Sequence, residues 1–504
     1  MKKSLFKSSL IFASLTFLSR ILGLVRDQII AIFYGANLYT DAFFVAFKIP
    51  NFFRRLFGES AFAQVFVPIL AEAKKNNQLK LVINVIGTKF FTLLLLITLL
   101  LIIFSPIFIM IFAWGYFIND DPTKYNLASE MLKITGAYLL FISITAFSGS
   151  IFNFHEKYSI QSFTPVLLNV TLILFILFFY DNFESPVFAL AWGVFFGGIL
   201  QFLFQIPFLY KLRLIPSFKW ISNEYTKKFY KRIIPTLFGV SITQVNIFID
   251  LVIATFLVSG SVTWLYYSDR FMELPLAIIG ISISTVSLTK LSFYFAEKDD
   301  IEFSRIINVA IKYVLIFSIP SLIGLVFLAE PIIFSTIQYK SFSVNDAILT
   351  SESLVAYSLG LLGFATGKIF ITAYVSQGDT RTPVIAAFFA MIVNLVLSIS
   401  LSNFIGHTGL ALATSVSGYV NCLILYKLLD KRSEIIIRWN FSYLPKILIA
   451  SSIMTLAIFF LKADTNFYIE SDFFDRISEL FINISIPGLV YFLILKYLGI
   501  DFRK

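Results

Sequence analysis

Charged side chains interrupt an otherwise apolar stretch near the start of the chain, between Ser19 and Pro68. They are Arg20, Arg26, Asp27, Asp41, Lys48, Arg54, Arg55 and Glu59. A charged side chain at the centre of a bilayer costs roughly 2.5–3.5 kcal/mol on insertion scales, so several of these charges must face a protein interior, a partner or a wet cavity. Lys48 and Arg55 could instead lie near an interface and extend their charged ends to water. The stretch therefore predicts a polar cavity inside a bundle of membrane helices.

The first three of these charges lie well inside an apolar run near 9–34, which is long enough to span a bilayer as a helix. At about 100° per residue, Arg20, Gly23 and Asp27 fall on one side of that helix. Arg26 points elsewhere unless the helix bends, which Gly23 would permit. We expect the face with Arg20 and Asp27 to line the cavity.

The second half of the chain has its own charged turn, which contains Asp269, Arg270 and Glu273. Arg270 and Glu273 are three residues apart, so they could simply pair on one helix. The alternative is that Arg270 converges with Arg26 and Arg54 on one anion, because guanidinium groups present rigid donor forks suited to phosphate. Both interpretations remain open at this point.

Three or four arginines in a low-dielectric cavity would hold a multiply charged diphosphate strongly. Asp27 and Glu59 would keep those arginines oriented when the cavity is empty. Asp250, in the apolar run VNIFIDLVIA, is a further intramembrane carboxylate. It could carry an ion or a proton, or it could be merely solvated near the outer interface. The pattern predicts a binding site rather than a catalytic one.

The composition excludes several other classes of protein. The chain has 504 residues, of which 58% are hydrophobic and 14% charged, whereas soluble domains carry about 25% charged residues. The net charge of +10 comes from basic residues in short connections between apolar segments, which favours membrane topology over nucleic-acid binding. One cysteine and two histidines leave no disulfide framework and no zinc cluster. Since no phosphate-cradling glycine loop or catalytic triad is present, we expect neither a metal, a cofactor nor an enzymatic activity.

Apolar segments long enough to span recur about fourteen times, which predicts an all-α polytopic membrane protein. They lie near 9–34, 41–69, 82–113, 130–153, 162–180, 186–210, 233–258, 263–292, 307–328, 350–375, 383–403, 407–429, 442–462 and 477–497. Connections rich in Lys and Arg alternate with connections that are poor in them or acidic. By the positive-inside rule, both termini are cytoplasmic and the number of spans is even.

The two halves of the chain also repeat one another. The run YTDAFFVAFKIPNFF corresponds to VTWLYYSDRFMELPL, and GSIFNFHEKYSIQSFTP corresponds to GKIFITAYVSQGDTRTP. Two six-helix lobes related by a pseudo-two-fold axis are implied, followed by two extra helices. We expect lobes at 1–212 and 233–430, a basic cytoplasmic linker at 213–232 and the C-terminal helices at 431–504. Alternating access to a cavity between the lobes is the natural transport mechanism for such a pair.

The runs SRILGLVRDQIIA, TDAFFVAFKIPNFFRRLFGESAFAQVFVPILAE and SGSVTWLYYSDRFMELP resemble the MurJ (MviN) lipid II flippases of the MOP transporter superfamily. The resemblance implies export of lipid II, the undecaprenyl-diphosphate-linked peptidoglycan precursor, from the inner to the outer leaflet of the bacterial cytoplasmic membrane. It also implies contacts with membrane lipids and cell-wall synthesis proteins. The lipid tail would lie in a groove that reaches the two C-terminal helices. Alternatively, these two helices only pack against the lobes as structural elements.

The resemblance also implies roles for particular residues. Arginines matching Arg20, Arg26, Arg54 and Arg270 are functionally important in the family, and acids matching Asp27 and Asp41 accompany them. We therefore expect the four arginines to bind the substrate, and Asp27, Asp41, Glu59, Asp269 and Glu273 to be supporting or gating charges. Some members bind sodium through acids in the seventh and eleventh spanning segments. Here the seventh segment, near 233–258, contains Asp250, whereas the eleventh, near 383–403, offers Asn394 and no acid. The alternatives are an exporter of another polyprenyl-diphosphate oligosaccharide, a drug/cation antiporter, or a membrane scaffold that transports nothing.

Overall fold

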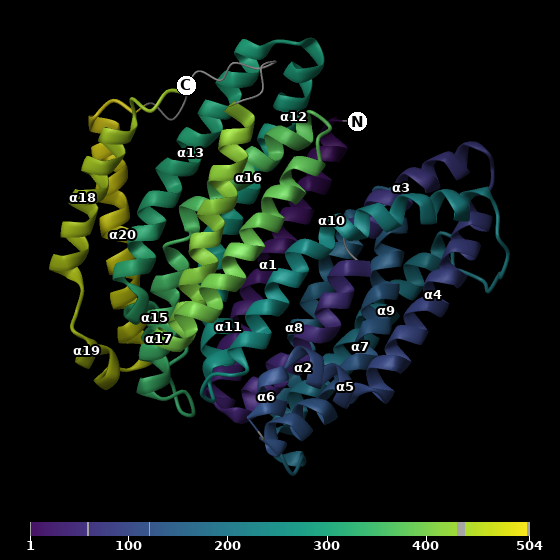
Figure 1. Cartoon of the computed structure of the whole chain (residues 1–504), viewed down its shortest axis with the longest axis horizontal. Helices are drawn as coiled ribbons and strands as arrows, with labels where there is room; N and C mark the ends of the chain where they lie inside the picture. The colour runs from purple at the N-terminus through teal and green to yellow at the C-terminus, as the bar shows by residue number, and fades with distance from the viewer. Residues whose placement is uncertain (1, 58–59, 120, 431–438, 501–504) are drawn as a thin grey trace. The chain divides into compact units, whose positions relative to one another are not determined.

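The computed structural model describes residues 2–57, 60–119, 121–430 and 439–500 (Figure 1). Throughout these ranges the chain is built of helices joined by short connections, and none of the described residues lies in a strand. Among them, ten helices are long and apolar enough to cross a membrane. The predicted all-α membrane fold is therefore confirmed.

The chain divides into two compact units, Met1–Gly260 and Ser261–Lys504. The helices of the first unit are α1 (Lys2–Tyr34), α2 (Leu38–Phe57), α3 (Ser60–Lys75), α4 (Leu79–Ile103), α5 (Ser105–Phe112), α6 (Trp114–Ile118), α7 (Pro122–Phe154), α8 (Tyr158–Phe179), the 3-10 turn η1 (Tyr180–Asn182), α9 (Phe188–Lys211) and α10 (Glu224–Ala254). Side-chain caps fix where some of them begin. The Asp121 carboxylate accepts from the backbone N–H of Lys124 at the start of α7, and Asn223 forms a capping box with Thr226 at the start of α10.

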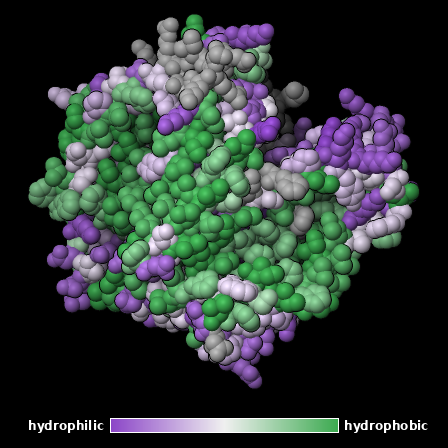
Figure 2. Space-filling view, viewed as in Figure 1, coloured by the Kyte–Doolittle hydropathy of each residue, from purple (hydrophilic) through white to green (hydrophobic). Residues whose placement is uncertain are grey.

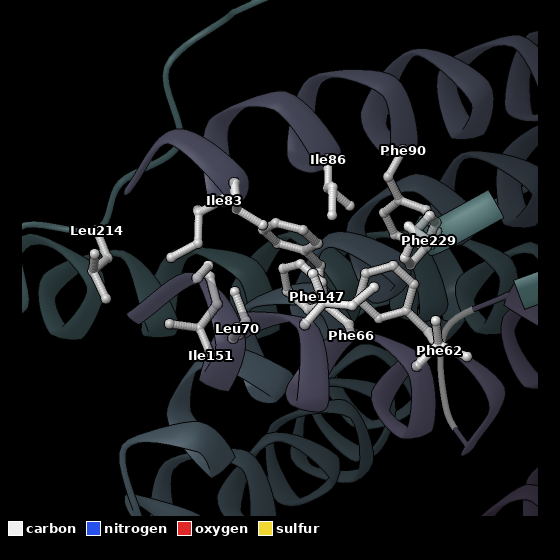
Figure 3. Close-up of a cluster of buried hydrophobic side chains, with 14 of the residues drawn as sticks. Phe62, Phe66, Leu70, Ile83, Ile86, Phe90, Phe147, Ile151, Leu214 and Phe229 are labelled. Atoms are coloured by element: carbon white, nitrogen blue, oxygen red, sulfur yellow. The ribbon is translucent and has the colours of Figure 1, made fainter. Parts of the chain in front are cut away.

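A cluster of buried aromatic and aliphatic side chains joins α3, α4, α7 and α10 in the first unit (Figure 3). Phe62 on α3 lies 4.4 Å from Phe90 on α4, between ring centroids, and Phe66 lies 5.0 Å from Phe147 on α7. Phe229 on α10 lies 5.6 Å from Phe62. The packing therefore joins α10 to the first unit, although α10 follows the basic linker in the chain. The division into repeats at 1–212 and 233–430 stays a prediction.

The second unit contains α11 (Ser261–Leu276), the π-helix η2 (Ala277–Ile281), α12 (Ser282–Glu297), α13 (Asp300–Phe327), α14 (Ala329–Thr336), α15 (Val344–Ser358), α16 (Leu361–Ser376), α17 (Arg381–Asp430), α18 (Leu444–Leu461), α19 (Thr465–Glu470) and α20 (Phe473–Tyr497). Helix α17 is interrupted at Ile405 and Gly406, where Gly406 has φ +58°. A positive φ of this kind favours glycine. The break falls in the connection predicted between 383–403 and 407–429.

The C-terminal helices α18 and α20 lie side by side (Figure 1) and pack against α13. The buried Tyr491 hydroxyl on α20 donates to the Ile316 carbonyl of α13 at 2.7 Å. At the other end of α20, Arg476 is 6% exposed and makes five hydrogen bonds to oxygen atoms of residues 334–338 and 469–471. These contacts show a packing role for the two helices, while a groove for a lipid tail stays a prediction.

Each of the fourteen predicted segments lies largely in helices over its described residues. Some of them are divided between successive elements: the segment near 41–69 between α2 and α3, that near 82–113 between α4 and α5, that near 263–292 among α11, η2 and α12, and that near 350–375 between α15 and α16. The surfaces of these helices are strongly apolar. On the face drawn in Figure 2, hydrophobic residues cover much of the helices and hydrophilic residues gather toward their ends. Phe178, Phe404 and Phe460 are 69%, 84% and 87% exposed. Large exposed apolar surface of this extent requires a partner, and for spanning helices that partner is lipid.

Candidate functional site

Arg26 and Asp27 form a buried ion pair on α1. Their exposed fractions are 6% and 2%, and the Asp27 carboxylate oxygen Oδ1 accepts from Arg26 Nε at 3.0 Å and from Nη2 at 2.5 Å. We expected Arg26 to share this side of the helix only if the helix bends at Gly23. The structure instead places both residues together within one uninterrupted helix. Neighbouring side chains on a helix can meet because the long arginine stem turns back toward the carboxylate.

Asn169 on α8 is a third member of this group, which we did not select from the sequence because its only signal there is a polar residue in an apolar segment. Arg26 Nη1 donates to Asn169 Oδ1 at 3.0 Å, and Asn169 Nδ2 donates to the Ser19 carbonyl at 3.0 Å. The amide therefore fixes the guanidinium plane and ties α8 to α1. Arg20, one residue after Ser19, has an exposed side chain and does not share this burial.

Helix α2 positions Asp41, Lys48 and Arg54. Asp41 is 2% exposed, and its Oδ2 accepts from the backbone N–H of Gly260 at 2.6 Å. The contact ties the end of the first unit to the start of α2, so Asp41 has a structural role in addition to any part in gating. Arg54 lies half-buried in the last turn, where its Nε donates to Asn51 Oδ1 at 3.1 Å, and Lys48 is also half-buried. Glu59 lies outside the described residues.

In the second unit, α11 carries the other predicted charges. Asp269 and Arg270 are half-buried and Glu273 is exposed. Arg270 Nη1 lies 3.6 Å from Glu273 Oε2, and the two side chains are 41% and 48% exposed. The pairing expected from the helical spacing is present, but ion pairs this exposed contribute only about 0–1 kcal/mol. A multiply charged anion can therefore compete with Glu273 for Arg270.

Lys368 on α16 is a cation that we did not select from the sequence. It is half-buried beside the π-helix η2, and a Cβ added to Gly280 would lie 3.0 Å from its Cδ atom. The carboxylate of Glu273 is close enough to act on its charge. A π-helical turn often marks a functional position. The signal available in the sequence was a lone lysine inside the apolar segment near 350–375, which is a candidate by default.

Asp250 lies half-buried near the end of α10, and Asn394 is fully buried on α17. Over the ranges that the structure describes, no group of three or more His, Cys, Asp or Glu side chains could hold a metal ion. The first unit thus presents Arg26, which is hydrogen-bonded to Asp27 and Asn169, and Arg54. The second presents Arg270 together with its neighbours Glu273 and Lys368. Convergence of the arginines on one anion stays a prediction.

Comparisons with known proteins identify the family of the chain. Residues 30–477 match the family described as "Lipid II flippase MurJ". The probable lipid II flippase MurJ of Haemophilus influenzae is 38% identical, over 96% of this chain and 98% of its own length. That of Vibrio cholerae is 40% identical, over 90% and 89%.

Solved structures give the same result. A lipid II flippase MurJ in an inward closed conformation has a TM-score of 0.83 at 29% identity, over 97% of this chain and 98% of that chain. An inward-facing multidrug resistance MATE transporter of the MOP superfamily has a TM-score of 0.68 at 14% identity, over 84% and 99%, which shows a shared fold alone. On these matches, the chain belongs to the lipid II flippase MurJ family.

Proposed function

We propose that this chain moves lipid II from the inner to the outer leaflet of the bacterial cytoplasmic membrane by alternating access, as a step in cell-wall synthesis. The observation that carries the proposal is the match to the family over residues 30–477, with relatives named lipid II flippase along nearly their whole length. The chain acts as a transporter without catalytic chemistry. Both termini lie in the cytoplasm.

The diphosphate of the lipid binds to arginines supplied by both units. Arg26 contributes a guanidinium whose plane is already fixed by Asp27 and Asn169. Preorganisation of this kind favours binding because little rotamer freedom remains to be lost. Arg54 on α2 and Arg20 on α1 add positive charge. Because a charge within the bilayer carries a free-energy cost unless it has a partner, binding of the diphosphate also reduces that cost.

In the second unit, the diphosphate displaces Glu273 from Arg270 and recruits Lys368. The exposed pair of Arg270 and Glu273 is weak enough to exchange. When the site is empty, the carboxylates Asp27, Asp41, Asp269 and Glu273 neutralise the cations and so reduce their desolvation cost. Changes in these pairings accompany the change between inward and outward access. Asp250 is the candidate carrier of a coupling ion or proton.

The test is the leaflet distribution of lipid II in bacteria whose own flippase can be depleted. The wild-type chain is compared with Arg26→Ala and Arg270→Ala, and with Lys290→Ala as the matched control. Lys290 is an exposed cation on α12, in the same helical rod as Arg270. A reagent that cleaves only lipid II exposed on the outer leaflet measures transport, and quantitative blots measure the amount of inserted protein.

We expect the wild type and Lys290→Ala to restore outer-leaflet lipid II, and the two arginine variants to fail at equal abundance. If the inserted wild type leaves lipid II inside, the flippase proposal is wrong for this chain. Export of another polyprenyl-diphosphate oligosaccharide in the same cells would then support the first alternative, and efflux of cationic dyes would support an antiporter. Normal function of both arginine variants would favour a scaffold.

A further inference from the structure

A cavity of about 250 Å³ lies in the first unit between α3, α4 and α10. Its inner wall is part of the aromatic core in Figure 3, with Phe62, Phe90 and Phe229. Its outer wall contains Leu93 and Ile234, which are 41% and 52% exposed. The cavity, which we call the α4–α10 pocket, is therefore almost entirely apolar and opens toward the lipid-facing surface. Its lining suits a hydrocarbon chain.

One cation stands among these apolar side chains. Lys89 lines the α4–α10 pocket, its Nζ donates to Ser222 Oγ at 2.6 Å, and it lies 5.9 Å from the ring centroid of Tyr230. Among the ion pairs of the described residues, none joins Lys89 to a carboxylate. A hydroxyl and an aromatic face leave the charge of the ammonium uncompensated. This position therefore suits an anionic group of a ligand whose apolar part occupies the pocket.

The segment 212–223 crosses the same end of α4. The backbone N–H of Ser217 donates to Asn84 Oδ1 at 3.0 Å, and that of Lys219 donates to Thr88 Oγ1 at 2.8 Å. Phe218 and Trp220 project from it and are 76% and 62% exposed. Exposed aromatic rings of this kind are typical of the boundary between membrane and water.

The basic residues around this segment agree with that placement. Residues 211–232 include seven Lys or Arg and one Glu. Lys227 lies three residues before Tyr230 on α10, on the side of the helix that forms the pocket. Basic clusters beside spanning helices attract the anionic lipids of the cytoplasmic leaflet. The mouth of the pocket thus combines an apolar interior with a positively charged rim.

We propose that the α4–α10 pocket binds one acyl chain of an anionic glycerophospholipid of the cytoplasmic leaflet, with the phosphate beside Lys89 and Lys227. The occupant is a bulk phospholipid rather than the transported lipid, because the pocket is too small for a long polyprenyl chain and because Arg20, Arg26 and Arg54 are not among the residues that line it. The bound chain fills the space between α4 and α10 and holds the basic segment at the membrane surface. This inference does not depend on the proposed transport function.

Photo-crosslinking tests the position of the chain. The full-length protein is placed in nanodiscs with phosphatidylglycerol that carries a diazirine near the end of one acyl chain, and labelled peptides are identified by mass spectrometry. We expect labels on the peptides of α4 and α10 that line the pocket. Leu93→Trp fills the pocket and should remove most of that labelling. Leu96→Trp is the matched control, because Leu96 is an exposed residue of the same helix that does not line the pocket.

The charge requirement is tested with the same label on phosphatidylcholine. One cation near the surface favours an anionic lipid by roughly five-fold, so Lys89→Met should lower the preference for phosphatidylglycerol by about that factor. Lys80→Met, an exposed lysine on the first turn of α4, should leave the preference unchanged. Ile234→Trp blocks the pocket from α10 and replaces Leu93→Trp if that variant does not fold.

Three results would overturn the proposal. The first is equal labelling by the two phospholipids in the wild type, and the second is unchanged labelling in both pocket-filling variants. The third is displacement of the phosphatidylglycerol label by an equimolar polyprenyl diphosphate, which would show that the pocket belongs to the transport substrate.

Discussion

Replacement of Asp27 by alanine removes the carboxylate that pairs with Arg26 while the guanidinium remains buried. In the folded protein, Asp27 accepts two hydrogen bonds from Arg26, at 3.0 and 2.5 Å, and the two residues are 2% and 6% exposed. Removal of one partner of a buried ion pair costs about 3–5 kcal/mol, because the other charge is left without compensation. That free energy corresponds to an increase of about 10²- to 10⁴-fold in the unfolding equilibrium constant.

The assay is denaturant-induced unfolding of the purified protein in detergent micelles, followed by tryptophan fluorescence. Arg305→Ala is the control, because Arg305 pairs with Glu302 at 2.7 Å but is 62% exposed. Exposed pairs contribute little, so this variant should unfold at nearly the same denaturant concentration as the wild type. The double variant Arg26→Met, Asp27→Leu leaves no unpaired charge and should regain much of the stability that Asp27→Ala loses.

The same variants separate stability from transport. If Arg26 binds the diphosphate, the double variant should be well folded and still unable to move lipid II. Unfolding of Asp27→Ala at the same denaturant concentration as Arg305→Ala would show that the buried charge of Arg26 needs no carboxylate partner. A double variant less stable than Asp27→Ala would show the same. Restored transport in the double variant would remove Arg26 from the set of substrate ligands.

Three further predictions concern packing and protonation. Gly115→Ala should destabilise the fold by about 1–3 kcal/mol, because the added Cβ would lie 2.4 Å from the backbone carbonyl carbon of Thr255. A Cβ added at Gly324 meets no atom within 4 Å, so Gly324→Ala should stabilise α13 by up to about 1 kcal/mol. Equal unfolding midpoints for these two variants would contradict the packing argument. Arg476→Lys should lower the thermal midpoint nearly as much as Arg476→Met, because an ammonium cannot make the five hydrogen bonds of the guanidinium; full rescue by lysine would show that charge alone is needed. Burial, aided by the charge of Glu479, raises the pKa of the Tyr468 hydroxyl to about 12 from its usual 10.0. Its neutral form therefore stabilises the fold below about pH 10, and that contribution is lost as the pH rises toward about 12. Tyr468→Phe should weaken the decrease in the free energy of unfolding over this pH range. If the decrease is the same in Tyr468→Phe as in the wild type, another group causes it.

The membrane fold and its helices could be predicted from the sequence because their causes are local. An apolar run of sufficient length forms a spanning helix whatever its neighbours are, since every backbone polar group must be satisfied within the bilayer. The apolar run that forms α4 is an example. The connection NFIGHTG was also predictable from local sequence, because Gly406 readily adopts the positive φ found at the break in α17. The family could also be recognised from its motifs, and the comparisons show it.

The candidate site was only partly accessible in this way. The cost of charge in a bilayer singled out Arg26, Asp27 and Arg270 without any structure. Helical spacing predicted the contact between Arg270 and Glu273, which the structure contains. Helical spacing did not predict the contact between Arg26 and Asp27. The angle between two Cβ atoms around a helix says little about where a long arginine side chain can place its guanidinium.

Tertiary structure alone decided which polar groups from distant segments meet. Asn169 holds Arg26 from 143 residues away, and the Gly260 backbone binds Asp41 across 219 residues. Lys89 reaches Ser222 over 133 residues at the rim of the α4–α10 pocket. No local pattern encodes such pairings, because they depend on how the helices pack and on which side-chain rotamers remain once they have done so. The sequence by itself thus determined the helical membrane fold, the family, and which charged side chains lie within apolar segments. The packing of the helices determined which partners hold each of those charges in place.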